Sequence, residues 1–92
     1  MGFLDKLKDV NEMRKQAKQI ELVLAQIDVT GKSSGSKIVI TMDGNQVVKS
    51  VQVDDSIVGD RGDIARNIRS ALEDLFKEHK KVLQSKFGSM MQ

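Results

Sequence analysis

Few residues in this sequence could act as catalysts or metal ligands. There is no cysteine, and the 92 residues contain no paired-carboxylate, nucleophile or phosphate-loop motif. His79 is the single histidine, and a lone histidine is more often a packing residue than a ligand. Helix capping rather than cation binding is expected for four aspartates that lack calcium-loop spacing, Asp54, Asp55, Asp60 and Asp63. The sequence therefore predicts a protein that is not an enzyme and that uses no metal, cofactor or small-molecule substrate.

The basic residues are the remaining candidates for chemistry, because lysine and arginine neutralise phosphate groups. Residues 1–18 have a net charge of +2 and residues 77–92 of +3, whereas residues 19–76 have −3. Phosphate contacts need charge and reach rather than rigid geometry, and the absence of Tyr and Trp argues against base stacking. The candidate DNA-binding residues are Lys6, Lys8, Arg14, Lys15, Lys18, Lys77, Lys80, Lys81 and Lys86. Lysine-rich helix faces are also commonly ordinary solvated surface, so the charge pattern alone leaves both interpretations open.

Two segments have the hydrophobic period of a helix. Over residues 3–27, apolar side chains recur at alternating spacings of three and four, which predicts a long amphipathic helix. A second apolar stripe predicts another helix over residues 63–86. Gly88 is expected to end this helix, leaving a short frayed tail at residues 88–92.

The segment between the helices, residues 27–53, is rich in β-branched residues. Alternating apolar and polar side chains predict three short strands, and Asp43-Gly44-Asn45 is a strong hairpin signal. With a two-residue turn, one face would carry Ile38, Ile40, Met42, Val47, Val51 and Val53. We therefore expect an α+β fold in a single domain over residues 1–92: a long helix, a three-stranded antiparallel meander and a second long helix.

Both predicted helices are longer than the sheet, because a seven-residue strand spans roughly 23 Å and 25 helical residues span roughly 37 Å. The first helix enters the sheet by its C-terminal end and the second leaves it by its N-terminal end, so both overhang the same end. We expect them to lie side by side there, with the apolar seam that includes Met13 and Leu24 packed against the second helix. The two basic segments would then form one positive tip.

Association with a second copy is expected for a chain of this size, since a short domain buries only ~60–65% of its unfolded surface. The predicted hairpin would otherwise leave apolar surface and strand edges uncovered. The sheet face away from the core is mixed in character. We expect this face to form a homodimer interface that includes Val39, Val48, Thr41 and Ser50.

Three short motifs resemble those of one bacterial family. MRKQAKQ at residues 13–19 is similar to its "MKQAQ" helix motif, and VTGKS at residues 29–33 is similar to its "VTGES" segment. TMDG at residues 41–44, followed by VQVD at residues 51–54, resembles its hairpin pattern. Order and spacing across residues 10–86 make the set more specific than any one motif. On these residues the chain resembles the YbaB/EbfC family of nucleoid-associated proteins.

The resemblance implies a tweezers-like homodimer whose sheets form the body and whose helical hairpins protrude. It also implies binding of double-stranded DNA with modest or no sequence preference, and a role in nucleoid organisation and gene regulation. The protein would then be cytoplasmic and associated with the nucleoid. The sequence departs from the family in its short tail and in Lys32, which stands where the family has an acidic residue.

A second class of function is compatible with the same sequence. A dimeric adaptor that binds other proteins, without physiological DNA binding, would also need long amphipathic helices, and its lysines would serve solubility. No apolar stretch approaches the ~20 residues of a membrane span, so we expect neither function to involve a membrane.

Overall fold

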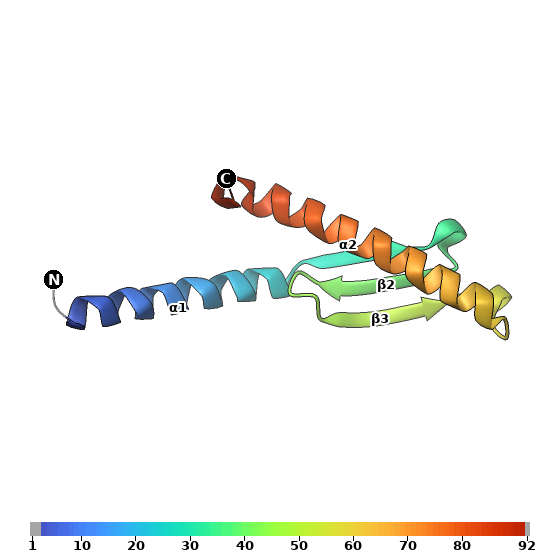
Figure 1. The fold of residues 1–92 in the computed structure, drawn as a ribbon, viewed down its shortest axis with the longest axis horizontal. Helices are drawn as coiled ribbons and strands as arrows, with labels where there is room; N and C mark the ends of the chain where they lie inside the picture. The colour runs from blue at the N-terminus through green and yellow to red at the C-terminus, as the bar shows by residue number, and fades with distance from the viewer. Residues whose placement is uncertain (1–2, 92) are drawn as a thin grey trace.

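Two long helices flank a three-stranded sheet in the chain (Figure 1). The computed structural model describes residues 3–91, and side chains are described for residues 9–88. The elements in chain order are α1 (Phe3–Ala25), β1 (Asp28–Lys32), a 3-10 turn (Ser34–Ser36), β2 (Ile38–Asp43), β3 (Val48–Val53), a second 3-10 turn (Asp55–Ile57) and α2 (Arg61–Met91). The α+β class and the element order predicted from the sequence are confirmed.

The sheet has the order β1-β2-β3 with both pairs antiparallel, which is the predicted meander. The β2–β3 turn, however, has three residues rather than two, and its last residue, Gln46, has a φ of 65°. With this turn Val48 lies opposite Met42, and a register shift between Met42 and Thr41 then places Ser50 opposite Thr41. Val48 therefore does not align with Val39 and Thr41, as a two-residue turn would have required.

The buried core lies between α2 and the first two strands. Its largest fully buried side chains are Ile38, Met42, Leu75 and Val29. α2 packs against β1 and β2 and does not cover β3. Val51 and Val53 pair with Ile40 and Ile38 as expected, yet both are exposed. Their assignment to the core was wrong because the helix is too narrow to cover the third strand.

Gly31 sets how closely α2 approaches the sheet. A Cβ atom at this position would lie 2.5 Å from the Ala71 carbonyl oxygen and from Leu75 Cα. Next to it, the Lys32 amide donates a hydrogen bond to Asp74 Oδ2 at 2.9 Å. A glycine inside a strand commonly marks such a close approach, and here it lets the helix backbone rest directly on β1.

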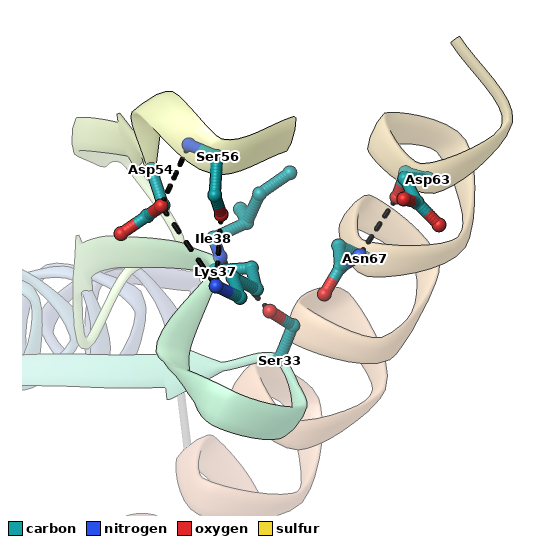
Figure 2. A network of polar contacts seen from close by, with 7 residues as sticks. All are labelled: Ser33, Lys37, Ile38, Asp54, Ser56, Asp63 and Asn67. Atoms are coloured by element: carbon teal, nitrogen blue, oxygen red, sulfur yellow. Dashed lines mark hydrogen bonds and ion pairs between the residues drawn. The ribbon is translucent and has the colours of Figure 1, made fainter. Parts of the chain in front are cut away.

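A polar network closes the end of the sheet near the start of α2 (Figure 2). Ser33 Oγ accepts a hydrogen bond from the Ile38 amide at 2.9 Å, and Lys37 Nζ donates to Ser56 Oγ at 2.8 Å. Asp54 Oδ1 accepts from the Ser56 amide at 2.8 Å and so caps the second 3-10 turn. These contacts satisfy backbone groups at the connections, and they agree with the capping role expected for this aspartate.

The helix ends differ from the predicted boundaries. α1 ends at Ala25, and α2 begins at Arg61, where Asp60 Oδ1 accepts a hydrogen bond from the Asp63 amide at 3.0 Å. Asp60 is thus the N-cap. Gly88 does not end α2, because the helix continues to Met91 with one non-helical residue at Phe87.

α1 projects away from the sheet instead of packing along α2 (Figure 1). The two helices leave the same end of the sheet, as predicted, but they diverge and share no extended packing interface. The apolar seam of α1 is therefore exposed, with Met13 at 67%. The radius of gyration is 18.6 Å, compared with roughly 12 Å for a compact chain of this length. The expected side-by-side packing of the helices was wrong.

Candidate nucleic-acid interface

The predicted basic residues lie on two helical arms, which we define as α1 and the C-terminal part of α2, residues 77–91. Both arms extend beyond the same end of the sheet (Figure 1). The packed face of an amphipathic helix is apolar, so the charged side chains of each arm can remain in solvent. The structure therefore gives two separate basic groups instead of one merged tip.

On α1 the described basic side chains are Arg14, Lys15 and Lys18, and all three are exposed. The helical period places them on one side of the helix, away from Asp9, whereas Glu12 is an i,i+3 neighbour of Lys15. No ion pair joins these three residues to a carboxylate in the part of the chain whose side chains are described. The side chains of two further candidates, Lys6 and Lys8, lie outside the described residues.

On α2 the structure brings three exposed lysines together within little more than one turn, Lys77, Lys80 and Lys81. The helical period places them on the side opposite Leu75, which faces the core. Lys81 Nζ lies 3.4 Å from Glu78 Oε1, an exposed pair of small energetic consequence. Lys86 is also exposed but lies on the Leu75 side of the helix, so it does not belong to this group.

Several basic residues of the body are paired with carboxylates, whereas Lys32 and Arg61 form no ion pair among the residues whose side chains are described. Arg66 is paired with Asp63, and Arg69 Nε lies 3.2 Å from Glu73 Oε1. Lys49 Nζ lies 2.6 Å from Asp28 Oδ1, and this hydrogen bond raises the pKa of the lysine. The arms therefore carry most of the described basic side chains that form no ion pair.

The two arms meet the sheet at the β2–β3 turn. The Gly44 amide donates to the Leu24 carbonyl of α1 at 2.9 Å, and the Gly44 carbonyl accepts from His79 Nε2 of α2 at 2.8 Å. Asn45 Nδ2 donates to the Glu21 carbonyl at 2.9 Å. We call these five residues the helix junction. His79 is half-buried, in agreement with the packing role expected for it.

Sequence reasoning missed the helix junction and the close approach at Gly31. A glycine in the middle of a strand was an available signal for the second feature. No comparable signal exists for the junction, because Gly44 and Asn45 read first as ordinary hairpin residues. Their contacts to the helices depend on how the turn meets α1 and α2, which local patterns do not specify.

Two other kinds of site are absent from the part of the chain that the structure describes. Within residues 3–91, no helix combines the length and apolar character needed to cross a bilayer. Among the same residues, no group of three or more histidine, cysteine, aspartate or glutamate side chains is arranged to hold a metal ion.

The fold is shared with a solved structure. An uncharacterized protein from Helicobacter pylori superposes with a TM-score of 0.80 at 24% sequence identity, covering 100% of this chain and 99% of that one. At this identity the likeness concerns the arrangement of the helices and the sheet.

Curated relatives carry functional names. A nucleoid-associated protein of Polynucleobacter necessarius is 29% identical over 77 residues, which is 84% of this chain and 72% of the relative. A nucleoid-associated protein of Rhodospirillum rubrum is 34% identical over 59 residues, 56% of this chain and 55% of the relative.

A family model matches the whole sequence. The match covers residues 1–92 and corresponds to the YbaB/EbfC DNA-binding family, which is not an enzyme family. It agrees with the three motifs and with the order of helices and strands. The chain therefore belongs to the YbaB/EbfC DNA-binding family.

Proposed function

We propose that this protein binds double-stranded DNA through the backbone phosphates, using the exposed basic residues of its two arms. The observation that carries the proposal is the contrast between arms and body. Lysines and an arginine are exposed on both arms, whereas several basic residues of the body are paired. Exposed helical lysines suit phosphate contacts, which need charge and reach but carry no base information.

We further propose that the functional form is a homodimer. Large apolar side chains are exposed on α1, on α2 and on β3, including Met13, Phe76 and Val51. Apolar surface of this extent, spread over an elongated chain, is typical of a surface that a partner covers. Val39, Thr41 and Ser50 remain the proposed sheet contribution, and their exposure ranges from half-buried to exposed, whereas Val48 lies opposite Met42 and does not align with them. A dimer would present four arms, which doubles the number of phosphates within reach.

The relatives' names support a place for the protein at the bacterial nucleoid. We propose a role in nucleoid organisation and gene regulation, because binding through phosphates distributes a protein over many sequences. Modest sequence preference follows from the same chemistry, since side chains that contact only the backbone do not distinguish base pairs.

The test is a gel-shift titration on several unrelated duplexes, with dimer state followed by light scattering. Replacing Lys15, Lys18, Lys80 and Lys81 with glutamate should abolish binding while the dimer and its circular dichroism spectrum remain. A matched control changes the net charge equally on the body, through glutamate at Lys32, Arg61, Arg66 and Arg69. Retained affinity in the arm variant, or equal loss in the body variant, would remove the arms from the mechanism.

Salt dependence gives a second measurement of the same proposal. If a dimer makes about 6–10 phosphate contacts, affinity should fall by ~10³–10⁵ between 50 and 200 mM salt. A shallow slope would mean that few phosphates are neutralised, and binding would then depend on other contacts.

A dimeric adaptor remains the alternative, favoured by the exposed apolar seam of α1. Such a protein would show no duplex shift even at low salt. It would instead bind a protein partner through the seam, and the arm variant would retain that partner.

A further inference from the structure

We propose that the helix junction fixes the angle between the two arms, with His79 and Asn45 as the residues that position them. This inference rests on the proposed function, because the angle matters to DNA binding only if the arms contact phosphates. The angle between the arms is a property of the protein alone, so it can be measured in the absence of DNA.

Few contacts other than those of the helix junction hold α1 in place. Its residues from Asp9 to Val23 are all exposed, and it shares no extended packing interface with α2 or with the sheet. Its direction therefore depends on its C-terminal turn. There, the Glu21 carbonyl accepts a hydrogen bond from Asn45 Nδ2, and the Leu24 carbonyl, which also accepts from the Ile27 amide at 3.1 Å, accepts one from the Gly44 amide.

A single residue, Gly44, forms hydrogen bonds with both helices. The Gly44 amide holds α1 through Leu24, and the Gly44 carbonyl holds α2 through His79. A carbonyl oxygen can only accept, so Nε2 of His79 carries the proton in this contact. Rotation of either helix relative to the other must therefore break or stretch a bond to this glycine.

Gly44 is also packed closely against α1. A Cβ atom on Gly44 would lie 2.8 Å from the Leu24 carbonyl oxygen and 2.9 Å from Leu24 Cδ2. Since φ of Gly44 is not positive, alanine is sterically excluded by α1 and not by its own backbone conformation. The glycine is thus required for the close seating of α1 on the turn.

The consequence is pre-organisation of the DNA-binding surface. Two basic groups held at a fixed angle contact phosphates without first losing the freedom of a swinging arm. If the junction is loosened, the number of lysines is unchanged, but they must be ordered at each binding event. Affinity should then fall while the salt slope stays the same.

Pairs of spin labels measure the angle directly. The chain has no cysteine, so Gln16→Cys on α1 and Gln84→Cys on α2 introduce one label pair per protomer. Refolding with excess unlabelled chain keeps the measured distance within a protomer. His79→Leu and Asn45→Ala should broaden the distance distribution, Gly44→Ala should shift its mean, and His79→Gln should restore the parent distribution by supplying an amide donor.

A matched control separates positioning from general stability. Asp74→Ala removes a helix-to-sheet hydrogen bond of similar length, to the Lys32 amide, which does not involve α1. It should lower the melting temperature and leave the distance distribution unchanged. His79→Leu should weaken duplex binding by about threefold to tenfold, whereas His79→Gln should not.

Unchanged distances in all three junction variants would overturn the inference, because the arms would then be held elsewhere, such as by a second chain. Broadened distances with full duplex affinity would overturn the positioning role. If the parent protein bound no duplex, the proposed function would fail, and the distances alone would decide whether the junction sets the angle.

Discussion

α1 and α2 are alike in sequence character and different in what covers them. Each is a long amphipathic helix with an apolar stripe and a group of exposed basic residues on its arm. The stripe of α2 buries Ala71 and Leu75 against β1 and β2, whereas the seam of α1 leaves Met13 67% exposed. One helix is therefore part of the protomer's core, and the other is held mainly at its C-terminal end.

The difference shows that hydrophobic periodicity predicts a helix without identifying its partner. An apolar stripe must be buried somewhere, but the surface that buries it can belong to the same chain or to another. In this protomer only α2 lies on the sheet, whereas α1 projects from its end (Figure 1). We therefore expect a second chain to bury the apolar seam of α1.

The largest expected effect comes from Gly31, which lets α2 rest on the sheet. Gly31→Val would place side-chain carbon within 2.5 Å of Ala71 and Leu75 backbone atoms, which move only if the helix moves. We expect a loss of about 4 kcal/mol or more in unfolding free energy. Gly88→Ala, which meets nothing within 4 Å, should change stability by less than about 1 kcal/mol. Urea denaturation measures both, and a small loss at Gly31 would mean that the helix approach is adjustable.

Adjacent residues of α2 provide the next comparison. Leu75 is 1% exposed and Phe76 is 54% exposed. Leu75→Ala should reduce the unfolding free energy by about 3 kcal/mol through the cavity it leaves. Phe76→Ala should cost much less at protein concentrations low enough to favour the separate protomer. Equal losses of unfolding free energy in the two variants at low protein concentration would contradict the division of α2 into a covered and an uncovered side.

The sequence predicted the elements and their order well because these depend on local patterns. Alternation in the segment from Ile38 to Val53 identified the strands, and the motif order identified the family. The two-residue turn was wrong because Gln46 adopts the left-handed conformation that glycine or asparagine usually takes. One additional turn residue placed Val48 opposite Met42, but the register shift between Thr41 and Met42 limits the error to that end of the strand, since Val51 and Val53 pair with Ile40 and Ile38 as expected.

The arrangement of the arms could not be derived in the same way. Helix lengths and strand lengths correctly placed both overhangs at one end of the sheet. Whether the overhangs touch depends on the direction in which α1 leaves the turn, and that direction depends on single contacts such as Gly44 with Leu24. The candidate lysines therefore lie on the two helices as predicted. They form two separate groups, however, and not one positive tip.

The α1 seam supplies a smaller and more specific prediction. Met13→Ala combined with Ile20→Ala removes apolar area that a second copy would bury, so the dimer should dissociate about tenfold or more readily. Gln16→Ala, on an exposed polar position of the same helix, is the control and should have little effect. Sedimentation across a dilution series distinguishes the variants. An unchanged dissociation constant in the double variant would place the dimer interface away from α1.

The smallest expected effect lies at the opposite end of the sheet, where Asp54 caps a 3-10 turn. Hydrogen bonds from the Ser56 side chain and backbone, and then the charge of Lys37, lower the pKa of Asp54. A lowered folded-state pKa contributes stability above the unfolded value of about 3.9, and this contribution is lost as pH falls through the folded pKa. Asp54→Asn should therefore lower the melting temperature slightly at pH 7, and the difference from the parent should shrink below about pH 4. In a Ser56→Ala background the same substitution should matter less, because the main cause of the shift is gone. A difference that stays constant from neutral to acid pH would show that the cap acts through its shape and not through its charge.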